Sequence, residues 1–360
     1  MPKLHALTGW QSWWATPLVG LLGGYLASLI GWPLPWIIGS LLAVIAVRCS
    51  GWLITELPGG RKTGQWLVSS AIGLHFTSEV FGQLLSHFGV ILLGALLTLL
   101  LSLIGIVVLR RAGLDRATAF FASMPGGASE MVNLAQRHNA ETAKVAAAHS
   151  LRLLLVVLLI PAIFTWSLPP IAPPAPAAVS WPWLAVLLPG GALLAWLWGR
   201  LGQPNPWMLG PLTVCAVASV SFDLHLGLPD GLGQTGQWLI GCALGCHFDR
   251  NFFRSAPGFL ARILLFCLLA MLAAAALGQG LGWLAGENQN ALMLGMMPGG
   301  ITELCLTAEA LHLSVALVTA LQVLRLFLVL FLAEPLFRLW PRGGNTVSDD
   351  VWPALRGLFV

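Results

Sequence analysis

The sequence predicts an all-α integral membrane protein, and two observations predict it: an apolar composition and an internal duplication. Of the 360 residues, 57% are hydrophobic and only 9% are charged, whereas a soluble globular protein carries about 25% charged residues. The mean hydropathy is +0.83. A chain with so few charged groups does not cover a water-facing surface, so the composition excludes a soluble enzyme, a nucleic-acid-binding domain and a disordered chain.

Three residue types refine this class. The chain contains seventeen Trp residues and one Tyr. Many of the Trp residues, such as Trp32, Trp36 and Trp181, flank apolar runs, as in an interfacial aromatic belt. Forty Gly and 23 Pro are too many for straight helices but are typical of membrane helices that pack closely or break.

Four sequence blocks recur in the same order in the two halves of the chain. They are PLPWIIGS at 33–40 and PNPWMLGP at 204–211, GQWLVSSAIGLHF at 64–76 and GQWLIGCALGCHF at 236–248, MPGGASEM at 124–131 and MPGGITEL at 297–304, and LRLLLV at 151–156 and LRLFLV at 324–329. We therefore predict a first membrane repeat at 1–166, a Pro-rich external linker at 167–182, a second repeat at 183–340 and a short cytoplasmic tail at 341–360.

Each repeat contains apolar stretches that are candidates for membrane spans. They lie near 16–31, 34–47, 64–84, 88–109, 117–136 and 141–165 in the first half, and near 183–199, 207–220, 236–248, 259–284, 291–310 and 314–337 in the second. The fifth stretch of each half carries Met-Pro-Gly-Gly in its middle. Proline removes a backbone donor and glycine loosens the chain, so we predict a broken helix there.

The distribution of Lys and Arg decides whether the broken element crosses the membrane or returns as a hairpin. If it crosses, the basic residues of the second half face the opposite side from those of the first. If it is re-entrant, sixteen of the eighteen Lys and Arg residues face one side, as the positive-inside rule requires. We therefore predict about ten transmembrane helices in two inverted five-span repeats, each with a re-entrant hairpin at its PGG motif and both termini cytoplasmic.

The two remaining basic residues are Arg152 and Arg325, at equivalent positions in the last span of each repeat. A charged side chain inside a membrane span is costly, so each arginine is expected to face the protein interior and to have a partner. His149 and Gln322 precede the arginines by three residues and share their helix face.

The inverted repeats are expected to bring the two hairpin tips together near the membrane midplane. Backbone N–H groups freed by the break and helix N-termini favour an anion, as in many secondary transporters. We predict a solute site built from the residues of both tips and the two arginines: Pro125, Gly126, Gly127, Ser129, Glu130, Arg152, Pro298, Gly299, Gly300, Thr302, Glu303 and Arg325.

A structural interpretation stands beside this one. Glu130 with Arg152, and Glu303 with Arg325, are then buried ion pairs that fix how each hairpin docks. The equivalent residues His75 and His247 are interpreted as packing or interfacial groups, with a proton relay as the alternative.

The sequence gives little support to an enzyme. It contains no H-E-x-x-H, G-x-S-x-G or Walker motif, and its eight His residues are scattered. Cys242, Cys246 and His247 could share a helix face and touch a soft metal, but they are interpreted as helix-packing residues. We expect no catalytic residue, metal or cofactor.

At the paired MPGGASEM/MPGGITEL and LRLLLV/LRLFLV blocks, the sequence resembles the bacterial membrane AbrB duplication family, and the resemblance covers nearly the whole chain. Members of this polytopic family carry the labels ammonia monooxygenase and regulator of the expression of the gene called aidB. The resemblance implies an inner-membrane protein and, through the second label, an effect on gene expression.

The sequence thus predicts a multi-pass protein of the inner membrane. The leading hypothesis is a secondary transporter for a small polar, anionic solute. The alternatives are a membrane-embedded sensor or regulator and, last, a membrane monooxygenase. The expected partners are the lipid bilayer and a small-molecule solute, with H⁺ or Na⁺ as candidate coupling ions and a homodimer suggested by analogy. No nucleic acid is expected, because no basic DNA-reading element is present.

Overall fold

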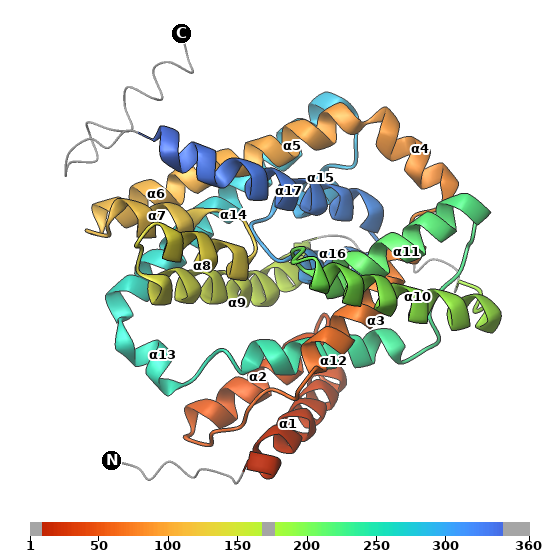
Figure 1. Cartoon of the computed structure of the whole chain (residues 1–360), viewed down its shortest axis with the longest axis horizontal. Coiled ribbons are helices and arrows are strands. Elements are labelled where there is room, and N and C mark those ends of the chain that lie inside the picture. Colours follow the sequence, from red (N-terminus) through yellow and green to blue (C-terminus); the bar gives the residue numbers. More distant parts are fainter. Residues whose placement is uncertain (1–8, 168–176, 341–360) are drawn as a thin grey trace. The chain divides into compact units, whose positions relative to one another are not determined.

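The computed structural model describes residues 9–167 and 177–340, and these residues form helices joined by short connections (Figure 1). The predicted linker from 168 to 176 and the tail from 341 lie outside the described residues. The helices of the first half are α1 (Gly9–Leu29), α2 (Pro35–Cys49), α3 (Gly60–Leu74), α4 (Ser78–Ser86), α5 (Phe88–Leu100), α6 (Ser102–Arg111), α7 (Arg116–Ser123), α8 (Ala128–Arg137) and α9 (Thr142–Ser167).

The second half presents the same order of long and short helices. They are α10 (Trp181–Arg200), α11 (Pro206–Phe222), α12 (Leu232–Gly245), α13 (Arg250–Ser255), α14 (Pro257–Ala285), α15 (Gln289–Met296), α16 (Ile301–Ala310) and α17 (Val315–Leu339). The continuous helix α14 occupies the place that α5 and α6 share in the first half.

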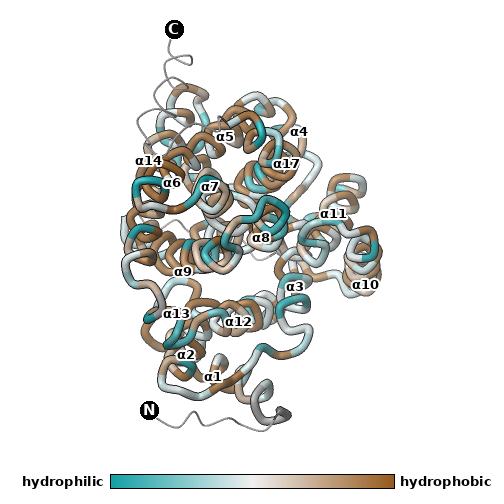
Figure 2. Tube along the Cα trace, turned by 60° about the vertical axis from the view of Figure 1, so that its left-hand side comes forward, coloured by the Kyte–Doolittle hydropathy of each residue, from teal (hydrophilic) through white to brown (hydrophobic). Residues whose placement is uncertain are grey.

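Five helices in the described part of the chain are long and apolar enough to cross a membrane. They are Phe88–Arg111 (α5 with α6), Thr142–Ser167, Trp181–Arg200, Pro257–Ala285 and Val315–Leu339. Hydrophobic residues dominate most of the chain, whereas α8 carries several hydrophilic ones (Figure 2). The prediction of a helical protein with membrane-spanning segments agrees with these helices.

The predicted stretch 64–84 is not one helix. It divides into α3 and α4, because the chain leaves the helix after Leu74 and restarts at Ser78. The hydroxyl of Thr77 accepts a hydrogen bond from the N–H of Val80 and so caps α4. Hydropathy alone did not reveal this boundary, because residues on both sides of it are apolar.

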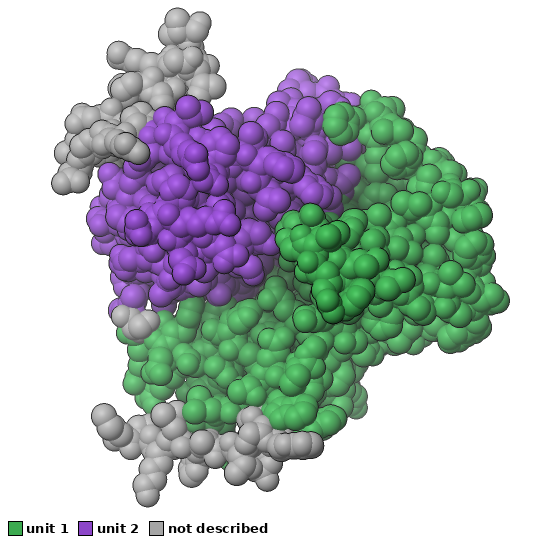
Figure 3. All heavy atoms as spheres, viewed as in Figure 1, with its two compact units in different colours: residues 1–88, 157–255, 301–319 green, residues 89–156, 256–300, 320–360 purple. Residues whose placement is uncertain are grey.

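The chain forms two compact units, which are coloured separately in Figure 3. Unit 1 contains residues 1–88, 157–255 and 301–319, and unit 2 contains residues 89–156, 256–300 and 320–360. Each unit therefore draws on both predicted repeats, since packing joins equivalent helices from the two halves.

Within unit 1, the first helix of each half packs on the second: α1 on α2, and α10 on α11. The third helix of each half packs on the second helix of the other half, so α3 lies on α11 and α12 lies on α2. Helices α3 and α12 also contact each other. A side chain at Gly64 would meet the carbonyl oxygen of Gly236 at 2.8 Å, and one at Gly236 would meet that of Gly64 at 3.0 Å.

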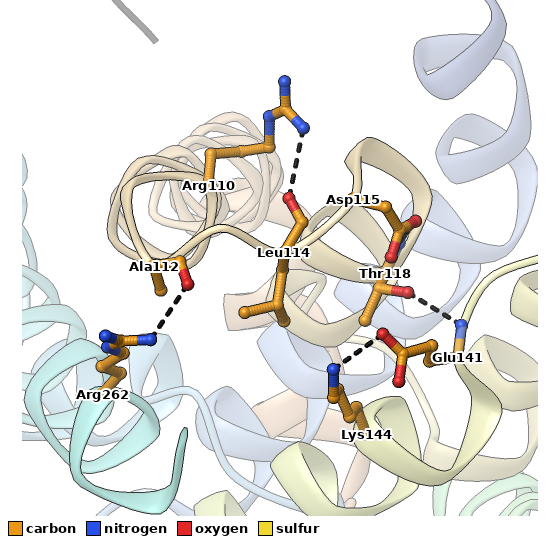
Figure 4. Close-up of polar contacts among 8 residues, drawn as sticks. All are labelled: Arg110, Ala112, Leu114, Asp115, Thr118, Glu141, Lys144 and Arg262. Carbon is orange, nitrogen blue, oxygen red and sulfur yellow. Dashed lines mark hydrogen bonds and ion pairs between the residues drawn. The ribbon is translucent and has the colours of Figure 1, made fainter. Parts of the chain in front are cut away.

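Unit 2 has a polar end at which several helices begin or finish (Figure 4). Arg262, near the start of α14, donates to the carbonyl of Ala112, just after α6, over 2.9 Å. Lys144 in the first turn of α9 binds Glu141 at 2.7 Å. The end of α6 and the start of α14 therefore lie on the same side of this unit.

Candidate functional site

Both Met-Pro-Gly-Gly motifs break a helix, as predicted. Helix α7 stops at Ser123, and Met124 is extended with φ −61° and ψ 135°. Helix α15 stops at Met296, and Met297 has nearly the same conformation, with φ −60° and ψ 141°. The carbonyl groups at the end of each first arm consequently lack helical partners.

The first broken element is a hairpin that closes on itself. The N–H of Glu141, which follows α8, donates to the hydroxyl of Thr118 in the first turn of α7 over 2.8 Å (Figure 4). The rings of Phe121 and His138 stack with their centroids 5.6 Å apart. The two arms therefore enter and leave at one end of unit 2.

Arg152 on α9 binds the backbone of the first break. Its Nη1 donates to the carbonyl of Met124 over 2.9 Å, and its Nη2 donates to the carbonyl of Gly126 over 3.3 Å. A second Nη2 bond of 2.9 Å goes to Nδ1 of His149. A cation at a helix C-terminus satisfies the unpaired carbonyls and interacts favourably with the helix dipole.

Arg325 on α17 makes the equivalent contacts at the second break. Its Nη1 donates to the carbonyl of Met297 over 2.8 Å, and its Nη2 donates to that of Gly299 over 2.7 Å. The same Nη2 also donates to Oε1 of Gln322. Arg152 and Arg325 are only 3% and 4% exposed. A buried guanidinium group needs hydrogen-bond partners, and for both arginines these are mainly backbone carbonyl oxygens.

His149 and Gln322 make equivalent hydrogen bonds, although one side chain is an imidazole and the other is an amide. Nε2 of His149 donates to the carbonyl of Phe121 over 3.0 Å while Nδ1 accepts from the arginine, which requires a neutral ring protonated on Nε2. Gln322 donates from Nε2 to the carbonyl of Gly295 over 2.6 Å and accepts from Arg325 through Oε1. Both side chains link an arginine to the last turn of a first arm.

The hydrogen bonds of Arg152 go to groups other than Glu130. Its three hydrogen bonds go to two carbonyls and an imidazole. Glu130 instead turns back over the start of α8, where a side chain at Gly127 would meet its Oε2 at 2.0 Å. Arg152 therefore binds the unpaired carbonyls of the broken helix, where the structural interpretation of the sequence expected an ion pair with Glu130.

The two prolines border one cavity inside unit 2. Pro125 and Pro298 line one cavity of about 10 Å³, together with Ser123 and residues of α5, α6 and α14. This volume is at the lower limit of what a single water molecule needs. Two further hydroxyls, Thr98 and Ser102, also line it. Sequence reasoning missed these three hydroxyls, because isolated Ser and Thr within apolar runs carry no distinguishing pattern.

The other predicted residues have varied surroundings. Gly126 has Val329 of α17 against it, since a side chain there would meet that residue at 2.8 Å. Ser129 is exposed. Thr302 and Glu303 belong to unit 1 and are buried there, at 4% and 9% exposure.

Each arginine retains a buried donor without an acceptor. Nε of Arg152 and Nε of Arg325 have no hydrogen-bond partner among the described residues. Buried donors nearly always have a partner, so such atoms call for an explanation. In the part of the chain that the structure describes, no group of three or more His, Cys, Asp or Glu residues is placed to hold a metal ion.

Known proteins are similar to this chain over most of its length. A family model described as "Transition state regulatory protein AbrB" matches residues 36–341. The chain is 28% identical over 356 residues to "Uncharacterized protein YhjN" of Bacillus subtilis (strain 168). This similarity covers 89% of this chain and 91% of that protein. It is 27% identical over 324 residues to "Putative regulator AbrB" of Escherichia coli (strain K12), covering 88% and 92%. The family resemblance read from the sequence is confirmed, and the protein belongs to the AbrB family.

Proposed function

We propose that this protein is a secondary transporter of the inner membrane that binds a small polar, anionic solute between two hairpins near the membrane midplane. The observation that carries the proposal is the pair of buried Nε donors of Arg152 and Arg325, which lack an acceptor among the described residues. A guanidinium donor is cationic, so an oxygen of a carboxylate, phosphate or sulfonate is the acceptor that suits it best.

The backbone around the breaks also suits an anion. The N-cap residue of α8, Gly127, makes no side-chain cap, and the carboxylate of Glu130 lies over this end of the helix. A negative group is favoured there by the helix dipole. Interrupted helices of this kind, in repeated halves, are the usual solute site of secondary transporters. The water-sized cavity between Pro125 and Pro298 then corresponds to a closed state that must widen to admit a solute.

We also propose ten spans in two inverted repeats, with both termini in the cytoplasm. The closed hairpin of α7 and α8 supports a re-entrant element, and the contact of Arg262 with Ala112 supports inversion. In two parallel six-span halves, the end of α6 and the start of α14 would lie on opposite sides of the membrane.

Thiol labelling in intact cells tests this topology. The Lys144→Cys and His225→Cys variants place one new thiol in each of two segments that the proposal assigns to opposite sides. A membrane-impermeant maleimide should label the His225→Cys variant and not the Lys144→Cys variant, with the unmodified protein giving the background of its own cysteines. Labelling of both positions, or the reverse pattern, contradicts the inverted arrangement.

A thermal-shift screen of the purified protein tests the solute site. Small carboxylates, phosphates, sulfonates and amino acids are compared, and a true ligand at 100 times its Kd stabilises the protein by about 2.7 kcal/mol. Ser129→Ala should weaken this response while leaving the melting temperature without ligand nearly unchanged. Ser86→Ala on α4 is the matched control and should respond like the unmodified protein.

Flux of the identified anion into liposomes then distinguishes transport from binding alone. If no compound stabilises the protein, the transporter proposal loses its support. A membrane-embedded sensor or regulator then becomes the better proposal, as the word "regulator" in the name of the E. coli relative suggests for that protein.

A further inference from the structure

The two arginine-bound breaks border one common space inside unit 2. Arg152 binds the two backbone carbonyls that flank Pro125. Arg325 binds the two backbone carbonyls that flank Pro298. Both prolines line the same small cavity. The backbone that each arginine holds therefore faces the backbone that the other arginine holds, across this cavity.

A packing contact joins the same two assemblies. Gly126, whose carbonyl accepts from Nη2 of Arg152, lies against α17, because a side chain at this glycine would meet Cγ1 of Val329 at 2.8 Å. Val329 follows Arg325 by four residues and so lies on the same face of α17. The first break thus packs on α17 one helical turn from Arg325, and a ligand that enters between the breaks has both arginines beside it.

Neither arginine is paired with a carboxylate. The hydrogen bonds of the two guanidinium groups go to backbone carbonyls, the imidazole of His149 and the amide oxygen of Gln322. Among the described residues, the one acidic side chain that is buried is Glu303, which belongs to unit 1. Carbonyl dipoles stabilise a cation but do not cancel its charge. The described interior of unit 2 therefore holds two positive charges, which are costly to bury without negative partners.

Glu130 does not supply the missing negative charge. It is half-buried, and its carboxylate lies over Gly127 at the start of α8. The N-terminus of a helix is the positive end of the helix dipole, so the carboxylate is stabilised in that place without an arginine. The hydrogen bonds of Arg152 all go to other groups.

Each arginine also has one hydrogen-bond donor left. Nε of Arg152 and Nε of Arg325 are buried and have no partner among the described residues. A carboxylate oxygen that accepts from such a donor also brings one negative charge to the guanidinium group. Two donors on two separate side chains therefore suit two acidic groups, and a solute that carries both groups supplies the two negative charges that this interior lacks.

We propose that the solute of this transporter is a diacid, in which one acidic group binds Nε of Arg152 and the other binds Nε of Arg325. The inference rests on the proposed function and narrows it from any small anion to a dianion with separated charges. A solute with a single acidic group leaves one donor unpaired and one positive charge without a partner.

Pairs of ligands that differ by one charge test this proposal. The unbranched dicarboxylates from malonate to adipate are titrated into the detergent-purified protein near neutral pH by isothermal calorimetry. Each is compared with its monoamide, which has nearly the same shape and one negative charge less. A hydrogen bond between two charged groups is stronger than one to a neutral amide, so we expect the best dicarboxylate to bind about tenfold more tightly than its monoamide.

Arg325→Gln removes one of the two positive charges and keeps an amide that donates hydrogen bonds. In this variant the dicarboxylate and its monoamide should bind with nearly equal Kd values. Arg338→Gln is the matched control on the same helix, because the side chain of Arg338 is 70% exposed, and it should preserve the tenfold difference. The melting temperature without ligand shows whether each variant is folded, and the comparison in the unmodified protein decides the proposal if Arg325→Gln is not.

Equal Kd values for the dicarboxylates and their monoamides in the unmodified protein would overturn the diacid and leave the anion transporter in place. Tighter binding of inorganic sulfate than of every dicarboxylate would also overturn it, because both charges would then lie on one group. Binding of none of these anions, with no response in the thermal-shift screen, would remove the diacid and the proposed function together.

Discussion

Arg152 and Arg325 hold two helix breaks in the same way, although they lie in different halves of the chain. In both, Nη1 binds the carbonyl of the methionine that ends the first arm, and Nη2 binds a glycine carbonyl two residues further on. Each arginine thus replaces the next turn of the helix as the partner of those carbonyls. Broken backbone at membrane depth is stable only when such partners exist.

Replacing Arg325 with Ala should strongly destabilise the protein. Two carbonyls and the side chain of Gln322 lose a charged donor, and bonds to charged groups contribute about 1.5–3 kcal/mol each. We expect a loss of about 3 kcal/mol or more, measured by thermal unfolding in detergent. Arg325→Lys should recover only part of it, because one ammonium group lacks the planar fork that reaches both carbonyls.

Arg338→Ala is the matched control on the same helix. Its side chain is 70% exposed and pairs with Glu334, so the loss should stay within about 1 kcal/mol. Equal melting temperatures for the Arg325→Ala variant and the unmodified protein would show that the carbonyl contacts do not stabilise the break.

His149→Gln should be tolerated, because Gln322 already performs this role in the second half. Glutamine has an oxygen to accept from Arg152 and an amide to donate to Phe121, as the neutral imidazole does. His149→Leu offers neither group and should cost about 1–3 kcal/mol of unfolding free energy. A transport or binding activity that His149→Gln abolishes while the melting temperature holds would contradict a purely structural role for this ring.

Gly64→Ala should destabilise the crossing of α3 and α12. The new methyl group would approach the carbonyl oxygen of Gly236 at 2.8 Å and the side chain of Ile240 at 2.9 Å. A backbone oxygen cannot rotate away, so we expect a cost of about 1–3 kcal/mol in thermal unfolding. Gly82→Ala on α4 meets no atom within 4 Å, and should be neutral or stabilising by about 1 kcal/mol.

Asp223 gives unit 1 a pH-dependent contact outside the membrane spans. The hydroxyl of Ser78 donates to its carboxylate and holds the pKa of Asp223 below its ordinary value. Because the folded pKa is depressed, this contact stabilises the fold above the unfolded pKa of about 3.9 and is lost as the pH falls through the folded pKa.

Thermal unfolding from neutral pH down to about pH 2, below the ordinary range of an aspartate, measures this effect. Ser78→Ala should lower the melting temperature at neutral pH, and the difference from the unmodified protein should vanish in acid. Asp223→Asn should remove the same part of the pH dependence. A Ser78→Ala difference that persists unchanged at the lowest pH would assign the loss to packing instead of the charge.

The sequence by itself determined the helical membrane class, the family and the positions of the two breaks. These are local properties: hydropathy needs only the composition of a stretch, and proline with two glycines interrupts a helix wherever it stands. The positions of Arg152 and Arg325 deep within apolar runs likewise indicate buried charges that need partners.

Only the tertiary structure decided what those charges bind and which distant residues share a pocket. The sequence suggested that Arg152 pairs with Glu130, yet the arginine binds backbone carbonyls. These carbonyls lose their helical partners where α7 ends, and the packing of α7 on α9 brings them to the arginine. His75 and Glu309 lie far apart in the sequence and carry no common motif, and they line one pocket only when α3 and α16 fold into one unit. The partner of a buried polar group is set by the packing of helices, which a pattern along one chain does not contain.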